Sequence, residues 1–112
     1  MTNKELLELA AKSVGVKLEY RQDCGAHYYN NPETGRERWN PLEDDGQALR
    51  VAVKLRLQVS PNDYDTMVNA RLPLHITAVE THNNDQYAAT RRAIVRVAAD
   101  IGRSLNIAGG VA

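Results

Sequence analysis

The chain has 112 residues with 43% hydrophobic, 25% charged and 5% aromatic residues, which predicts one globular domain and excludes a wholly disordered or fibrous chain. The 14 basic residues balance the 14 acidic ones, whereas dedicated nucleic-acid or membrane-surface proteins are usually strongly basic. Cys24 is the single cysteine, no secretory signal opens the sequence, and no apolar run reaches the ~20 residues that span a bilayer, so we expect a cytoplasmic protein without a membrane segment.

The N-terminal segment has the pattern of an amphipathic helix that ends at Gly15. Thr2 and Glu5 form a capping box, in which the hydroxyl accepts a hydrogen bond from the first turn. Glycine is common just after a helix because it adopts left-handed backbone conformations without strain. The apolar residues fall on one broad face: Leu6, Leu7, Leu9, Ala10 and Val14.

The next segment has the alternation of strands. A half-buried strand is expected at 16–21, followed by strands at 26–30 and 36–39. The stretches 23–25 and 31–35 are rich in turn residues. The region therefore predicts an antiparallel meander of three strands.

A second helix is expected from about Glu43 to Arg56. Acidic residues at 43–45 are typical of a helix start, where negative charge meets unpaired N–H groups. Its apolar arc is wide, and we interpret it as the most buried helix: Ala48, Leu49, Val51, Ala52, Val53 and Leu55.

The following segment contains the strongest alternation in the chain. A strand is expected to begin at 57–59, and turn residues then predict a loop over 60–69. Alternating apolar residues then predict a strand at 72–78, and Pro73 places it at a sheet edge or a bulge because proline cannot donate to a ladder.

The last helix is expected to begin near Asp85, with residues 108–112 as a frayed tail. Its basic residues form a ridge almost opposite the apolar face: Arg91, Arg92, Arg96 and Arg103. We favour a solvated helix face as the interpretation of this ridge. The alternative is a contact for nucleic acid or a nucleotide phosphate through Arg92, Arg96 and Arg103.

Together these elements predict a single α+β domain at 1–112, with a small, mostly antiparallel sheet covered by about three helices. A core of this size is modest, so we also expect a homodimer, formed through an apolar helix face or a sheet edge. The predicted core contains Leu6, Leu9, Leu49, Ala52, Leu55, Leu74, Ile76, Ile94 and Ile101.

Catalytic and metal-binding patterns are missing from the sequence. His27, His75 and His82 lack metal-ligand spacing, and the acids at 43–45 lack the alternation of a calcium loop. No basic pattern surrounds Cys24 to activate its thiol, and the sequence has no nucleophile elbow, phosphate-binding loop or dinucleotide motif. We therefore expect no metal, no cofactor and no enzymatic activity.

The segment from Tyr28 to Pro41 resembles the second half of a WW domain, a family that binds polyproline helices. The resemblance implies a ligand face at Tyr29 and Trp39. Two positions depart from the family pattern: Leu18 stands where the first tryptophan falls, and Pro41 comes one residue early. Trp39 therefore has two interpretations, a structural one in which it packs under the turn into the second helix, which we favour, and a ligand-binding one.

Three blocks, in this order, are similar to a group of small tailed-phage and prophage proteins of enterobacteria. They are residues 1–12, residues 39–50 with the sequence WNPLEDDGQALR, and residues 88–96 with the sequence AATRRAIVR. The resemblance implies a phage accessory protein with an α-β-α sandwich character and implies no activity. We expect a non-enzymatic protein that binds a host or phage macromolecule.

Overall fold

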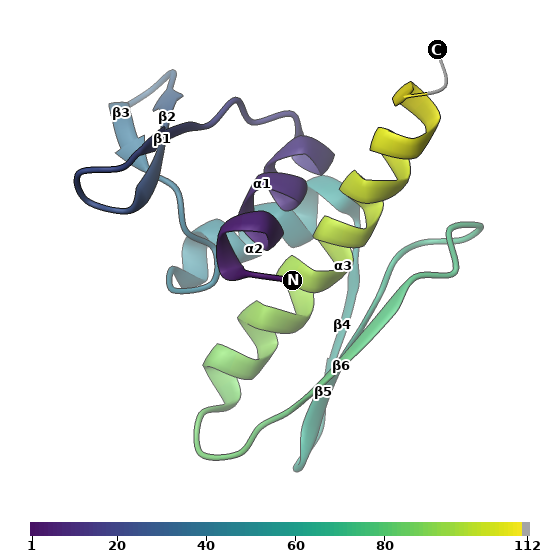
Figure 1. Ribbon diagram of the computed structural model, residues 1–112. Coiled ribbons are helices and arrows are strands. Elements are labelled where there is room, and N and C mark those ends of the chain that lie inside the picture. Colours follow the sequence, from purple (N-terminus) through teal and green to yellow (C-terminus); the bar gives the residue numbers. More distant parts are fainter. Residues whose placement is uncertain (111–112) are drawn as a thin grey trace.

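The computed structural model describes residues 1–110, and side chains for residues 1–105. Three helices and six strands make up this part of the chain (Figure 1). In chain order they are α1 (Asn3–Val14), β1 (Glu19–Arg21), β2 (Ala26–Asn31), β3 (Gly35–Arg38), α2 (Asp45–Leu55), β4 (Gln58–Pro61), β5 (Asp65–Asn69), β6 (Thr77–Thr81) and α3 (Gln86–Gly110).

The predicted α+β class, antiparallel pairing and three helices are confirmed. The strands divide between two antiparallel sheets, with the orders β1-β2-β3 and β4-β5-β6, where we expected one. The tail expected at 108–112 is helical as far as Gly110, and residues 111–112 lie outside the described part of the chain.

Helix α3 is the centre of the molecule. It runs diagonally through Figure 1, with α1 on one side and the β4-β5-β6 sheet on the other. Its buried residues therefore lie on more than one face: Ala89, Ala93, Ile94, Val95, Val97, Ala98, Ala99 and Ile101. The prediction that α2 is the most buried helix is wrong, because α2 packs at the margin and leaves one side in solvent. Within the described residues, no helix combines the length and apolar character needed to cross a membrane.

Helices α1 and α3 cross at very short range. At Gly102 of α3, a β-carbon would collide with the backbone carbonyl of Leu9 in α1. Ala10 on α1 and Ala98 on α3 are fully buried, which keeps the two backbones close along the contact. Small residues, rather than large ones, therefore line the contact between α1 and α3.

The β4-β5 hairpin corrects the loop predicted at 60–69. The Asn62 side chain accepts hydrogen bonds from the backbone N–H groups of Tyr64 and Asp65, at 2.8 and 3.0 Å, and so closes a short turn. In β5, Thr66 and Val68 point inward. Because Thr66 is polar but buried, the sequence of β5 lacks the alternation of apolar and polar residues that predicts a strand.

The strand predicted at 72–78 is also wrong over most of its length, because β6 begins at Thr77. Residues 71–76 form a turn that contains a cis bond between Leu72 and Pro73, and His75 adopts a left-handed backbone conformation. The alternating leucines, Leu72 and Leu74, are exposed. Alternation here does not reflect a buried face, because the turn extends beyond the sheet.

The buried core is built mainly from alanine and valine. Of the predicted core residues, Leu6, Ala52, Ile94 and Ile101 are buried, and Leu9, Leu55 and Ile76 pack partly against them. Leu49 and Leu74 are exposed, so these two predictions are wrong. Leu49 lies on the side of α2 that no other element covers, and Leu74 lies in the 71–76 turn.

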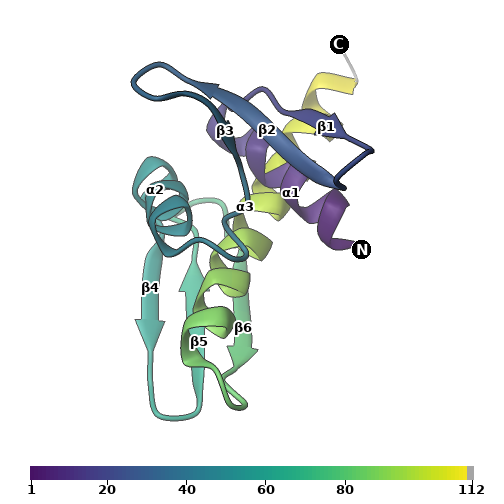
Figure 2. The same cartoon turned by 90° about the vertical axis from the view of Figure 1, so that its left-hand side faces the viewer.

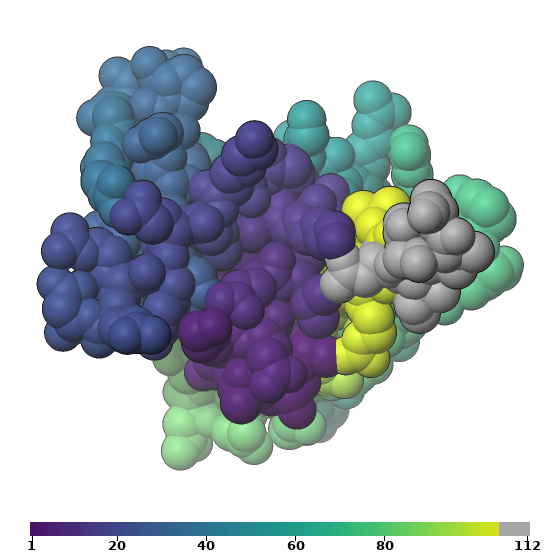
Figure 3. Space-filling model, turned by 45° about the horizontal axis from the view of Figure 1, so that its top comes forward, coloured from purple at the N-terminus to yellow at the C-terminus, as the bar shows by residue number. Residues whose placement is uncertain are grey.

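The β1-β2-β3 meander projects from one side of the body, as Figures 2 and 3 show. Its first strand is shorter than the predicted 16–21, and all three β1 residues are exposed. Trp39 and the buried Gln47 connect the meander to α2. The Gln47 side chain donates to the backbone oxygen of Arg38 at 2.7 Å and accepts from the backbone N–H of Asn40 at 2.6 Å.

Candidate functional site

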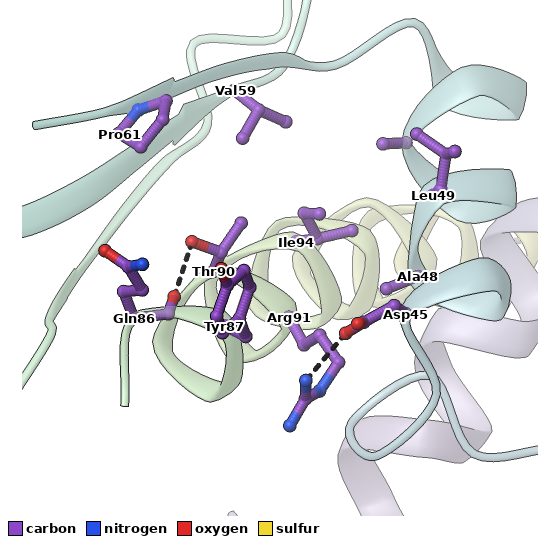
Figure 4. Close-up of a pocket in the computed structure, with 11 residues that line it drawn as sticks. Asp45, Ala48, Leu49, Val59, Pro61, Gln86, Tyr87, Thr90, Arg91 and Ile94 are labelled. Atoms are coloured by element: carbon purple, nitrogen blue, oxygen red, sulfur yellow. Dashed lines mark hydrogen bonds and ion pairs between the residues drawn. The ribbon is translucent and has the colours of Figure 1, made fainter. Parts of the chain in front are cut away.

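An open groove of about 540 Å³ lies between α2, β4 and α3 (Figure 4). Helix α2 forms one wall, strand β4 the opposite wall, and the N-terminal half of α3 the floor. Asp44 caps α2 by accepting from the N–H of Gln47 at 2.8 Å, and Asp85 caps α3 by accepting from the N–H of Ala88 at 2.9 Å. These caps fix the two helix starts on either side of the groove opening.

The lining of the groove is mostly aliphatic. Seven residues supply this surface: Ala48, Leu49 and Ala52 from α2, Val59 and Pro61 from β4, and Tyr87 and Ile94 from α3. Leu49 keeps 63% of its surface exposed and Tyr87 keeps 65%. Apolar side chains of this size gathered in one concave patch are typical of a binding surface.

Gln86, Thr90, Arg91 and Asp45 are polar residues at the groove, and the last three are already partnered. Arg91 forms an ion pair with Asp45 at 2.7 Å and donates from Nε to the backbone oxygen of Leu42 at 2.8 Å. The Thr90 hydroxyl donates to the backbone oxygen of Gln86 at 2.8 Å. Among the described side chains, no buried nitrogen or oxygen lacks a partner. The groove therefore offers apolar contact, with one internally paired charge at its end.

The arginines of α3 do not form an uncompensated basic ridge. Arg96 contacts Glu80 of β6 at 2.6 Å, and Arg92 lies 3.9 Å from the same carboxylate. Arg103 lies about two turns further along α3, where its guanidinium donates to the sulfur of Met1 at 3.5 Å. The structure thus brings Arg92 and Arg96 together around one acid and leaves Arg103 apart.

Tyr29 and Trp39 do not form an open aromatic groove. Trp39 is 4% exposed and belongs to the main core, in line with the structural interpretation of this residue. Tyr29 packs against that core, and its hydroxyl donates to Glu37 at 2.9 Å. Burial and this hydrogen bond raise the pKa of Tyr29. Trp39 is therefore enclosed in the core, whereas Tyr29 is half-buried at the edge of it.

A polar cluster of Lys4, Glu8, Tyr20 and His27 connects the meander to α1. Glu8 accepts from Lys4 at 2.8 Å and lies 3.1 Å from Nε2 of the buried His27. The Tyr20 ring tilts against His27, with centroids 4.9 Å apart, and Lys4 lies over the Tyr20 ring. The hydrogen bond from Lys4, followed by that from His27, lowers the pKa of Glu8. Within this cluster, Glu8, Tyr20 and His27 line an open hollow of about 360 Å³.

Another polar cluster, formed by Thr66, His82 and Thr90, joins the β4-β5-β6 sheet to α3. Thr66 is fully buried, and its hydroxyl lies 2.9 Å from Nε2 of His82 and 2.8 Å from the hydroxyl of Thr90. Within residues 1–105, no three His, Cys, Asp or Glu side chains gather in a way that would hold a metal ion. His27 and His82 belong to different hydrogen-bonded clusters, and His75 lies in the exposed 71–76 turn.

The sequence does not predict the groove. Three of its lining residues, Leu49, Ala52 and Ile94, are expected in the core, and Tyr87 has no predicted role as a site. The available signal was the width of the α2 apolar arc, since Leu49 and Val53 extend it beyond what one packing face needs.

Comparison with known proteins gives no further constraint. No family model, curated protein or solved structure matches the chain.

Proposed function

We propose that the chain is a non-enzymatic phage or prophage accessory protein that acts in the bacterial cytoplasm by binding a protein through the groove between α2, β4 and α3. The observation that carries the proposal is the groove itself, an aliphatic hollow of about 540 Å³ beside the exposed Leu49. The similarity of three sequence blocks to phage and prophage proteins supports the biological setting.

The shape of the groove favours a helical segment over an extended one. Strand addition needs a free row of backbone donors, and β4 ends at Pro61, which has no N–H. Two of the three elements that border the groove are helices, and Ala48 and Ala52 on α2 leave room for a close approach. An amphipathic helix laid into an apolar groove fits this arrangement.

The test is photo-crosslinking from position 49 in host cells that express the protein. The protein that crosslinks is then purified, and its affinity for the wild-type chain and for the variants is measured. Burying a leucine contributes about 1.5–3 kcal/mol, so Leu49→Lys should weaken binding by at least about tenfold. Leu72→Lys is the matched control, because Leu72 is an exposed leucine outside the groove.

Two outcomes would contradict the proposal. One is a crosslinked partner whose affinity is the same for wild type and Leu49→Lys. The other is salt-dependent retention on DNA that is lost in Arg92→Ala/Arg96→Ala, because this result supports the alternative nucleic-acid function. We expect no such retention, since Arg92 and Arg96 share the carboxylate of Glu80.

A further inference from the structure

One exposed stripe of α2 carries two large aliphatic residues between opposite charges. Asp45, Leu49 and Val53 are spaced by four residues, which places them on one side of α2, and Arg56 follows the last helical residue, Leu55. Leu49 is 63% exposed and Val53 is 68% exposed. Two neighbouring aliphatic side chains with this exposure form a ridge along the rim of the groove.

The order of charges along the stripe selects one way of pairing two copies. The stripe begins with an acid, Asp45, and ends with a base, Arg56. Two α2 helices packed antiparallel would place Asp45 of each copy opposite Arg56 of the other, and Leu49 opposite Val53. A parallel arrangement would place Asp45 against Asp45 and Arg56 against Arg56, and like charges repel.

Asp45 is accessible for this contact. It meets Arg91 through Oδ1 at 2.7 Å, yet 73% of its side chain remains exposed. The Arg91 contact fixes the carboxylate at the start of the stripe, so less side-chain entropy is lost when a second cation approaches. Arg56 is the left-handed C-cap of α2, so a base stands at the opposite end of the helix from Asp45.

The groove supplies the hollow that the aliphatic ridge needs. Leu49 belongs both to the stripe and to the groove lining, so the ridge and the hollow lie side by side. A twofold dimer requires such self-complementarity, because each copy must offer both the knob and its receptor. With Ala48 and Ala52 in the wall, a leucine or valine from a second helix has room to approach.

We infer that the occupant of the groove is the α2 helix of a second copy of this chain, packed antiparallel about a twofold axis. The inference rests on the proposed function, since it names the protein that the groove binds. It assigns Leu49 and Val53 as the central contacts and the Asp45–Arg56 pairs as the two flanking contacts.

The first experiment is sedimentation equilibrium on the full chain over a range of concentrations. We expect a wild-type species of twice the 12.5 kDa chain mass. Because each dimer contains Leu49 twice, Leu49→Lys should raise the dissociation constant roughly a hundredfold. Leu72→Lys should leave it unchanged. A circular-dichroism melt checks that both variants fold, which we expect because both positions are exposed.

The second experiment reads the direction of packing from cysteine crosslinking in a Cys24→Ser background. A mixture of the Leu49→Cys and Val53→Cys variants should form the mixed disulfide, whereas each variant alone should form little. Preferential crosslinking of each variant with itself would overturn the antiparallel arrangement.

The outcomes separate this inference from the proposed function. A wild-type chain that stays monomeric, or a dimer that Leu49→Lys leaves intact, overturns the inference. If the chain is monomeric and position 49 crosslinks to a different protein, the inference fails while the proposed function stands. If position 49 crosslinks to no protein and the chain is monomeric, both fail.

Discussion

Replacing Gly102 by alanine tests the packing on which the fold depends. In an exposed helix interior this change is stabilising, by about 1 kcal/mol, because alanine is the better helix former. At Gly102, however, the new β-carbon would come within 2.8 Å of the Leu9 carbonyl carbon and closer still to its oxygen. Two effects of opposite sign therefore compete at one position.

The size of the clash decides whether Gly102→Ala stabilises or destabilises the protein. Both collision partners are backbone atoms, so no side chain can rotate away and α1 must move as a unit. Overpacking of this kind costs about 1–3 kcal/mol, and more where the backbone must shift. Moving α1 also separates its buried face from α3, and a gap of about 0.5–1 Å forfeits a quarter to a half of each dispersion contact. We expect a net loss of roughly 2–4 kcal/mol in the free energy of unfolding.

Urea unfolding followed by circular dichroism measures this loss, with Gly46→Ala as the control. Gly46 lies in the first turn of α2, where a β-carbon would meet only a side-chain oxygen of Asp44, at 3.3 Å. The control should change stability by less than about 1 kcal/mol. A Gly102→Ala variant at least as stable as the wild type would refute the close crossing of α1 and α3.

Three further predictions concern the joints between the meander and the body. Trp39→Ala removes a buried ring from the core and should cost about 3–5 kcal/mol, and the native protein should show blue-shifted emission poorly quenched by iodide. Gln47→Ala leaves two backbone groups without partners and should cost about 2–4 kcal/mol in urea unfolding, unlike Arg50→Ala on the exposed side of the same helix. The Lys4 hydrogen bond lowers the pKa of Glu8 in the folded protein. The stability that the ionised Glu8 contributes is therefore present above the usual pKa of 4.5 and is lost as pH falls through the folded pKa. Glu8→Gln should flatten the pH dependence of the melting temperature in that acidic range.

Local signals predicted the helices correctly. The Thr2 hydroxyl accepts from the N–H of Glu5 at 3.1 Å, and Gly15 ends α1 in a left-handed conformation. Asp44 and Asp85 cap the other two helices. Each of these signals acts within four residues, so the sequence is sufficient to identify it.

The errors arose where distant contacts decide the structure. Turn residues predict a loop over 60–69, whereas Thr66 of β5 is buried and makes hydrogen bonds to His82 and Thr90, which lie 16 and 24 residues away. Leu72 and Leu74 alternate as in a strand, but no other element covers the turn that contains them. Neither fact is visible from local periodicity.

The α2 helix shows how the same pattern can indicate either burial or binding. Its apolar arc contains Ala48 and Ala52, which the fold buries, and Leu49 and Val53, which it leaves exposed. Val51 is buried beside the two alanines, whereas Leu49 and Val53 stay in solvent, which transfer free energy alone would not favour for a monomer. A second surface that covers Leu49 and Val53 removes this contradiction, and the acid at the start of α2 and the base at its end are the reason that we propose an antiparallel copy of α2 as that surface.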